Sequence, residues 1–217
     1  MIQVRDVFQI KFGSIDQAVA LFSRLPQAAP SYSPTRVHYH ILTDISGPMY
    51  TLIAEYMAEN MGDWEKMRDA SFAAPEFAEW FKQFQLFVED GQREYFTLEG
   101  ECEDWSQPGV IIAREVYKAY KWQIRPAVTL LQRYGALLVE RGVGHRPRIL
   151  TDACGPMFRA VIEIETEGLA KWEAQRRELF QQAEFQVWFK QLVTVVKAGW
   201  HEFFRVEATA GGAAGVL

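Results

Sequence analysis

The sequence predicts an α+β protein made of two tandem βαββαβ repeats that close into a single barrel, and three observations lead to this prediction. A long stretch of the first half returns in the second half with few changes. Each copy shows the same succession of strand-like and helix-like segments. A unit of this kind leaves one face of its sheet bare, and a bare sheet face must be buried against a partner.

The internal repeat is visible by direct alignment. Residues 43–50, with the sequence TDISGPMY, return as residues 151–158, TDACGPMF, at a spacing of 152 − 44 = 108. Aligning residues 41–99 with residues 149–207 without a gap gives 24 identities in 59 positions. Unrelated sequences of ordinary composition would share roughly 3 or 4. The chain is therefore an internal duplication.

The first copy can be divided into elements in order. Residues 4–12 have strand composition, and Ser14 is a suitable N-cap for the helix that follows. Residues 36–44 and 49–57 are predicted to form a hairpin around Ser46-Gly47-Pro48, which favour a turn. Residues 63–72 are helical, Pro75 begins another helix, and residues 93–99 form the last strand.

The helix that begins at Pro75 carries an apolar stripe. Its members fall at i, i+3, i+4, i+7 and i+11, and they are Phe77, Trp80, Phe81, Phe84 and Val88. The second copy has the same spacing in Phe185, Trp188, Phe189, Leu192 and Val196. This period is typical of a helix packed on a core, so the aromatic residues need no cofactor to explain them.

The order β-α-β-β-α-β is that of the ferredoxin-like split βαβ unit. Two such sheets, each covering the bare face of the other, would give one pseudo-dimeric α/β barrel with the helices outside. We expect a first ferredoxin-like repeat over residues 1–99, a linker over 100–109, a second ferredoxin-like repeat over 110–207 and a flexible tail over 208–217.

Composition excludes several classes of protein. The net charge of −5 argues against a nucleic-acid partner. No window approaches eighteen uninterrupted apolar residues, so no membrane span is expected, and the first residues do not have the pattern of a signal peptide. Two cysteines make neither a disulfide framework nor a cysteine zinc site. A cytoplasmic setting is expected.

The repeat resembles members of the dimeric α/β barrel superfamily and, within it, NIPSNAP-like proteins. The resemblance lies in Arg5 and Arg114 on the first strands, the Thr-Asp-x-x-Gly-Pro-Met hairpin, and a Trp-Glu helix followed by Phe-x-x-Trp-Phe. It covers about residues 4–99 and 113–207. The superfamily contains cofactor-free monooxygenases, isomerases, haem-using enzymes and non-enzymatic stress proteins, so the resemblance implies the fold and does not select a function. The resemblance does not assign a catalytic or binding role to any residue of this chain.

Period-two alternation predicts which side chains point away from the helices. On the first and third strands these include Arg5, Glu55, Arg114, Arg159 and Glu163. On the last strands they would be Tyr95, Thr97 and Glu99, and Phe203, Arg205 and Glu207. The two first-strand arginines could bind an anionic ligand through bidentate hydrogen bonds. Salt bridges across the barrel are the alternative, because buried charges are normally paired.

His38 and His40 lie two residues apart on a strand and therefore point the same way. They could supply metal ligands or an acid–base group, or be partly exposed strand residues. Their counterparts are Arg146 and Arg148, so the copies diverge here. No acidic or cysteine residue completes a metal pattern nearby, so no metal and no cofactor is predicted. Haem, a third hypothesis, would need His38 or His40 as its axial ligand.

The hairpin motif offers a candidate nucleophile, Cys154. Ser46 occupies the equivalent position in the first copy, and the motif holds no histidine to activate a nucleophile. An aspartate that caps a tight turn and a glycine that supplies its backbone explain the motif without catalysis.

The sequence therefore favours a small-molecule binding protein or a cofactor-independent, monooxygenase- or isomerase-like enzyme with an aromatic or apolar ligand in the barrel. The alternative is a non-catalytic structural or interaction protein whose barrel is filled by its own side chains. No catalytic residue can be assigned. Pairing into a homodimer through helix faces or a sheet edge is open.

Overall fold

The computed structural model describes residues 1–25, 39–100, 107–142 and 145–210. These ranges contain six helices and eight strands, which makes the protein α+β. The chain divides into two compact units, Met1–Tyr95 with Val206–Leu217 and Phe96–Arg205. In the described part of the chain, no helix is long and apolar enough to cross a membrane.

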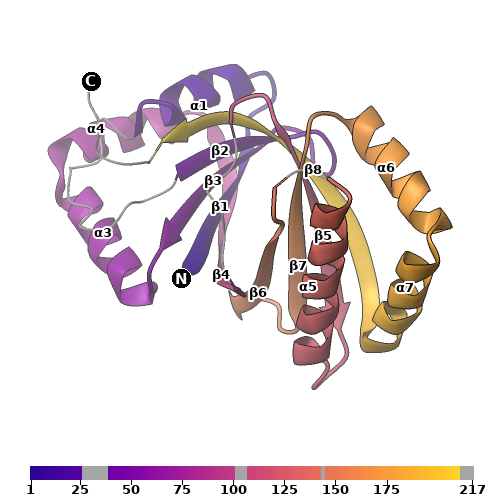
Figure 1. Cartoon of the computed structure of the whole chain (residues 1–217). Helices are drawn as coiled ribbons and strands as arrows, with labels where there is room; N and C mark the ends of the chain where they lie inside the picture. Colours follow the sequence, from indigo (N-terminus) through magenta and orange to yellow (C-terminus); the bar gives the residue numbers. More distant parts are fainter. Residues whose placement is uncertain (26–38, 101–106, 143–144, 211–217) are drawn as a thin grey trace. The chain divides into compact units, whose positions relative to one another are not determined.

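The first unit contains three antiparallel strands, three helices and most of a fourth strand. Its elements are β1 (Ile2–Ile10), α1 (Ile15–Phe22), β2 (Tyr39–Asp44), β3 (Thr51–Ala58), α3 (Met61–Ala73), α4 (Pro75–Phe84) and the larger part of β4 (Val88–Leu98). β3 lies between β1 and β2 and pairs with both. The three helices lie on the same face of these strands (Figure 1).

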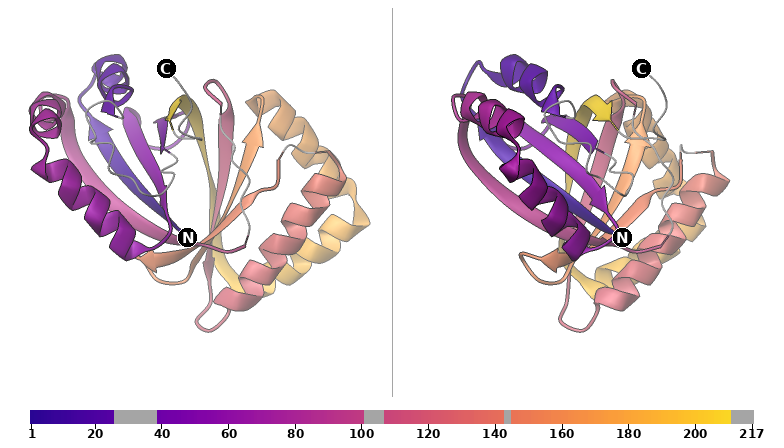
Figure 2. Two further views of the ribbon diagram at one scale, coloured as in Figure 1. Left: turned by 60° about the vertical axis from the view of Figure 1, so that its left-hand side comes forward. Right: turned by 90° about the vertical axis from the view of Figure 1, so that its left-hand side faces the viewer.

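The second unit repeats this order. Its elements are β5 (Ile111–Ala119), α5 (Ile124–Glu140), β6 (Arg148–Cys154), β7 (Arg159–Thr166), α6 (Leu169–Gln181), α7 (Ala183–Val195) and most of β8 (Val196–Ala210). β7 pairs with β5 and β6, and β5 also pairs with β8. The helices again cover one face of the strands (Figure 2). Over the whole chain the antiparallel strands form a closed barrel in the order β1-β3-β2-β8-β5-β7-β6-β4.

The core of each unit lies between its helices and its sheet and is anchored by one tryptophan. In the first unit the Trp80 indole Nε1 donates to the carbonyl of Leu21 at 2.9 Å, and Trp80 packs on Phe22 and Phe84. In the second unit Trp188 Nε1 donates to the carbonyl of Leu130 at 2.7 Å. The predicted apolar stripe is thus the part of α4 and α7 that faces the core, and its buried indoles have the hydrogen-bond partner that such groups need.

Several predicted limits were wrong. α4 and α7 end at Phe84 and Val195, so Val88 and Val196, assigned to the helical stripe, begin β4 and β8 instead. Ser14 occupies the N-cap position of α1, yet its side chain makes no capping hydrogen bond. β8 continues to Ala210, three residues into the predicted tail. Residues 211–217 of that tail and 101–106 of the predicted linker lie outside the described residues.

The last strands face the opposite way from the prediction. Tyr95 accepts a hydrogen bond from the Trp64 indole of α3 at 3.3 Å, and Phe203 packs edge-on against Trp172 of α6 at 4.8 Å. Both side chains therefore lie on the helix-covered face, and their neighbours Glu94 and Glu202 lie on the other. We call this other face the helix-free face of each unit.

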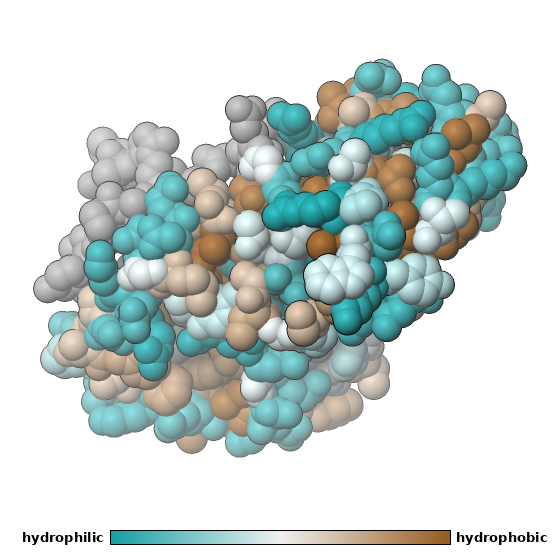
Figure 3. Space-filling view, turned by 90° about the horizontal axis from the view of Figure 1, so that it is seen from below, coloured by the Kyte–Doolittle hydropathy of each residue, from teal (hydrophilic) through white to brown (hydrophobic). Residues whose placement is uncertain are grey.

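Large apolar side chains also reach the surface, where they are interspersed with polar residues (Figure 3). Phe12 and Met49 are exposed at turns of the first unit, and Trp122 and Met157 at the corresponding turns of the second. Single exposed apolar side chains are normal on a protein surface.

Candidate functional site

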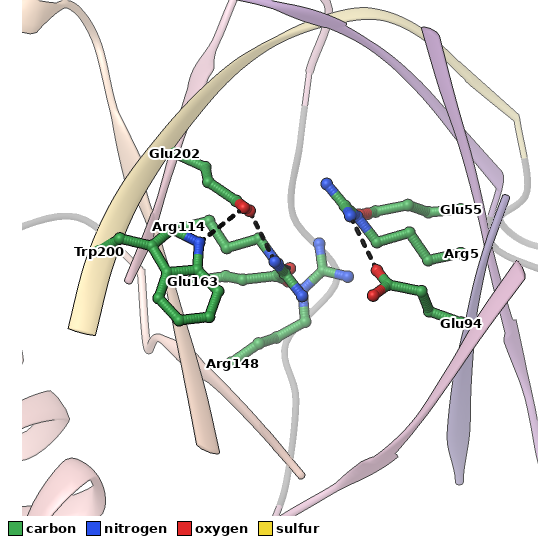
Figure 4. A network of polar contacts seen from close by, with 8 residues as sticks. All are labelled: Arg5, Glu55, Glu94, Arg114, Arg148, Glu163, Trp200 and Glu202. Atoms are coloured by element: carbon green, nitrogen blue, oxygen red, sulfur yellow. Dashed lines mark hydrogen bonds and ion pairs between the residues drawn. The ribbon is translucent and has the colours of Figure 1, made fainter. Parts of the chain in front are cut away.

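The helix-free face of the first unit buries an arginine between two glutamates. Arg5 of β1 lies opposite Glu55 of β3, and its Nε contacts Oε1 of Glu55 at 3.2 Å. Its Nη1 contacts Oε2 of Glu94 of β4 at 3.1 Å (Figure 4). The Arg5 side chain is only 4% exposed. Ion pairs this deeply buried hold their side chains in one geometry, because any lost contact would leave a charge without solvent.

The second unit repeats the arrangement atom for atom. Nε of Arg114 on β5 contacts Oε1 of Glu163 on β7 at 3.2 Å, and Nη1 contacts Oε2 of Glu202 on β8 at 2.7 Å (Figure 4). A second guanidinium reaches the same carboxylate: Nε of Arg148 on β6 lies 3.7 Å from Oε2 of Glu163. This set, which we call the Arg114 cluster, consists of Arg114, Arg148, Glu163 and Glu202.

Three of the differences between the two helix-free faces lie in or beside the charged clusters. His40 lies opposite Glu55 where the second unit has Arg148 opposite Glu163. Thr51 is replaced by Arg159, which is buried with its guanidinium 4.8 Å from the ring of Phe96. Arg114 lies 5.2 Å from the same ring, so Phe96 has two cation–π partners. The second face is therefore richer in positive charge.

The third difference is Trp200 on β8, which stands where the first unit has Gln92. Its indole Nε1 donates to Oε1 of Glu202 at 2.9 Å. Trp200 is 41% exposed, and the Glu202 side chain is 27% exposed. The matching Glu94 side chain is 12% exposed. The Arg114 cluster thus has one end that solvent reaches, at Glu202 and beside Trp200.

The predicted site residues are placed as follows. Arg5 and Glu55 form one cluster, and Arg114 and Glu163 form the other, while Arg159 lies on the same face as the second pair. His40 is buried on β2, and His38 lies outside the described residues. The residues that the structure describes contain no group of three or more His, Cys, Asp or Glu side chains arranged to hold a metal.

Sequence reasoning missed three members of these clusters. Glu94 and Glu202 were placed on the wrong face, and Arg148 was noted only as the counterpart of His40. A signal was available for the glutamates, because they are identical in the two copies at the repeat spacing of 108. Trp200 carries no such signal, since it occurs in one copy only.

A second polar cluster in each unit lies on the helix-covered face. Asp6 accepts two hydrogen bonds from Arg93, at 2.5 and 2.7 Å. These bonds, more than any other cause, raise the pKa of Arg93. Burial raises the pKa of Tyr56 and of Tyr39 far above the ordinary value, and Asp6 adds to this effect. Both phenols therefore stay protonated well above pH 10.

The equivalent cluster in the second unit has a different composition. Tyr117 donates to Oε2 of the buried Glu115 at 2.5 Å, and burial raises the pKa of Tyr117, with Glu115 as the next cause. His201 takes the place of Arg93, with its Nε2 at 3.5 Å from Oε1 of Glu115. Arg176 of α6 donates to the His201 ring at 2.8 Å. These contacts connect α6 with the sheet.

The Thr-Asp-x-x-Gly-Pro motif forms a tight hairpin in both units. Oδ1 of Asp44 accepts from the backbone N–H of Thr51 at 2.7 Å, and Asp152 accepts in the same way from Arg159. Gly47 and Gly155 have positive φ angles of 96° and 122°, which favour glycine. The predicted hairpin, with an aspartate as its cap and a glycine in the turn, is confirmed. Cys154 is an exposed free thiol at the end of β6.

The comparisons with known proteins concern the fold. No protein-family model matches the sequence, and no curated protein matches it in sequence. An anthrone oxidase-like protein has a similar structure over 99% of this chain and 96% of its own, with 13% identity and a TM-score of 0.68. A proposed monooxygenase from Fusobacterium nucleatum matches over 97% of this chain and 94% of its own, with 7% identity and a TM-score of 0.74.

A NIPSNAP domain protein from Burkholderia xenovorans matches 48% of this chain with 100% of its own, at 11% identity and a TM-score of 0.41. The two matches over nearly the full length carry the conclusion, and at these identities a structural likeness shows the fold alone. The chain has the dimeric α/β barrel fold, as its repeated sequence predicted.

Proposed function

We propose that this chain is a small-molecule binding protein that oxidises an aromatic ligand with dioxygen and without a cofactor, on the helix-free face of its second unit. The observation that carries this proposal is the Arg114 cluster, which places buried arginines, a partly exposed carboxylate and the ring of Phe96 on one face. Burying such charges costs several kcal/mol per ion, so apolar residues would serve a purely structural core as well or better.

The proposal includes the tandem organisation. Two ferredoxin-like repeats, over residues 1–99 and 110–207, are supported by the 24 identities in 59 positions and by the equal element order of the two units. Register supports it as well, because Arg5 pairs with Glu55 and Arg114 with Glu163 at matching places in their sheets.

The residues suit oxidation of a carbon acid. A carboxylate can remove a proton from an activated C–H group, and a nearby guanidinium stabilises the anion that forms. The likeness to an anthrone oxidase-like protein and to a proposed monooxygenase points to the same reaction type. For anthrone, a tricyclic aromatic ketone, the ring CH2 group becomes C=O: one O2 is consumed, one oxygen atom enters the product, and the other leaves as water with the two hydrogens.

The experiment that tests this function is oxygen uptake by the purified full-length chain with anthrone as the substrate. We expect one O2 consumed for each anthraquinone formed, at a rate that a metal chelator does not change. A native mass spectrum of the fresh protein would also show any carried ligand as mass above the 25.0 kDa of the chain. Oxygen uptake no faster than with heat-denatured protein would refute the proposal.

A non-catalytic protein is the second candidate, and one observation favours it. Arg5 and Arg114 each form ion pairs with two glutamates through the same atoms and at the same register. This is expected if both sets of ion pairs serve to hold the sheets. In this case no ligand would be carried and anthrone would not be oxidised.

A further inference from the structure

We infer that the second unit binds the surface of an anionic lipid membrane through one exposed end, without crossing the bilayer. This end consists of the turn between β5 and α5, the start of β7 and the junction of α7 with β8, and we call it the Trp122 tip. Its exposed side chains are Tyr120, Lys121, Trp122, Met157 and Lys197. The inference goes beyond the proposed function and does not depend on it, because no residue of the tip belongs to the Arg114 cluster.

Backbone hydrogen bonds bring the three segments of the tip together. The N–H of Ala119 donates to the carbonyl of Phe158 at 2.8 Å, and the N–H of Tyr120 donates to the carbonyl of Val195 at 2.9 Å. Met157, directly before Phe158, therefore lies beside the turn that carries Tyr120. One exposed apolar side chain would be ordinary, but here two aromatic rings and a methionine are exposed on neighbouring segments.

Trp122 has a backbone conformation that favours glycine. Its φ angle is 71°, and the equivalent residue of the first unit is Gly13, with a φ angle of 78°. The two turns match because in each of them the next residue donates its N–H to the carbonyl three residues earlier. A bulky side chain in the left-handed region is strained, and Trp122 is 78% exposed, so burial within the chain does not offset this strain. Such a position is expected where the indole serves a partner outside the chain.

The side chains around Trp122 are positively charged. Lys121 lies 5.3 Å from the Trp122 ring, and Lys197 occupies the bulge where β8 pairs with the end of β5. Among the residues that the structure describes, neither lysine forms an ion pair. The sequence has no acidic residue between positions 116 and 139 or between 185 and 201. The tip therefore combines exposed apolar side chains with uncompensated positive charge, which is the pattern of a site for an anionic membrane surface.

The equivalent end of the first unit has exposed apolar residues but the opposite charge. Phe12 is 82% exposed at the turn between β1 and α1. Glu89 and Asp90, both exposed, stand where the second unit has Lys197 and Ala198. Carboxylates at this place repel an anionic surface. The first unit is therefore an internal control, because it offers an exposed aromatic ring without the positive charge.

A lipid surface suits this combination of side chains better than a nucleic acid does. Indole and phenol rings are enriched at the boundary between lipid headgroups and acyl chains, and a methionine side chain can enter the acyl region but cannot recognise a base. Arg125, three residues after Trp122, is also exposed but pairs with Glu99 at 2.7 Å, so Lys121 and Lys197 supply the attraction. The net charge of the whole chain is −5, so this attraction is local to the tip.

The test measures sedimentation of the full chain with vesicles of one-third phosphatidylglycerol and two-thirds phosphatidylcholine. We expect the wild type to bind these vesicles and to be released at about 1 M salt, where the Debye length falls to about 3 Å. Trp122→Gly should weaken binding about 10-fold, because one large apolar side chain no longer enters the membrane. This variant also removes the backbone strain, so its unfolding temperature should be no lower than that of the wild type. Phe12→Ala, the matched control, should change binding less than about 2-fold.

The role of charge is tested with Lys197→Glu, which introduces the residue of the first unit. We expect it to weaken binding to the anionic vesicles about 10-fold. Its control is Lys66→Glu on α3 of the first unit, where the lysine is also exposed and the net charge changes equally. The control should change binding less than about 2-fold.

Three results would overturn the inference. The first is vesicle binding by Trp122→Gly that equals that of the wild type. The second is no binding of the wild type to anionic vesicles together with binding to a single-stranded oligonucleotide that depends on Trp122, which would assign the tip to a nucleic acid. The third is a dimer that depends on Trp122 in the absence of lipid, measured by analytical ultracentrifugation, which would assign the tip to a second copy of the chain.

Discussion

The guanidinium Nε of Arg114 lies 3.2 Å from Oε1 of Glu163, and both side chains are almost fully buried. Glu163→Gln would leave the positive charges of Arg114 and Arg148 with a weaker partner. We expect the free energy of unfolding to fall by about 3 kcal/mol, measured by urea denaturation. The control is Glu167→Gln, which removes the exposed Lys171–Glu167 pair and should cost less than about 1 kcal/mol. Equal costs for the two variants would contradict the prediction.

Gly199 lies against the ring of Tyr117, and a Cβ at this position would meet a ring carbon at 2.8 Å. Gly199→Ala should therefore displace Tyr117 and lower the free energy of unfolding by about 1–3 kcal/mol. Gly91→Ala should do the same in the first unit, where the Cβ would meet Phe8 at 2.9 Å. Thermal unfolding measures both. Adding Phe8→Leu to Gly91→Ala should recover part of the loss, and a double variant that is no more stable than Gly91→Ala would argue against this clash.

Four of the eight tyrosines should resist ionisation until the protein unfolds. Burial raises the pKa of Tyr39, Tyr56, Tyr117 and Tyr134 above the ordinary value of about 10. Above pH 10 the unfolded chain therefore binds fewer protons than the folded chain, and the free energy of unfolding falls as the pH rises. Below pH 10 these groups are protonated in both states and add no pH dependence.

Near-ultraviolet absorbance of phenolate checks this prediction. The folded protein should show at most about half the phenolate absorbance of the urea-unfolded protein at the same alkaline pH. The rest should appear together with the loss of the circular dichroism signal. If the folded protein showed the full phenolate absorbance of the unfolded protein, the prediction would be wrong.

The hairpin aspartates should matter for stability and not for turnover. Asp44→Ala removes the acceptor of the Thr51 N–H, and we expect it to lower the free energy of unfolding by about 1–2 kcal/mol. Asp44→Asn keeps an acceptor and should cost less. The kcat of both variants with anthrone should equal that of the wild type. A large loss of turnover in a folded variant would point instead to a catalytic hairpin.

Much of the architecture followed from the sequence because the repeat made every pattern visible twice. The order of elements, the hairpin and the core faces of α4 and α7 were predicted, and the alternation on β1 and β5 placed Arg5 and Arg114 correctly on the helix-free face. Polar and apolar side chains do not alternate clearly over Val4, Arg5 and Asp6. The prediction that Arg5 lies on the helix-free face depended on Phe8 and Ile10, whose apolar side chains indicate the opposite face.

The last strands could not be assigned in the same way. Between residues 93 and 99, apolar and polar side chains occur on both faces, since Tyr95 packs on Trp64 while Phe96 packs beside Arg114. The alternation of side chains along these strands therefore does not indicate which of their faces the helices cover. The exposed end of the Arg114 cluster could not be predicted from the sequence either, because the contact between Trp200 and Glu202 depends on the rotamers of two side chains.

Two strands belong to both units. β4 continues into the second unit with Phe96–Leu98, and β8 continues into the first with Val206–Ala210. A chain cut within residues 101–106 would give two fragments, each carrying the short strand end that completes the other's sheet. Alone, a fragment would expose an unpaired edge and tend to aggregate. Together they would exchange these ends and recover the fold, so the protein is suited to complementation as a split reporter.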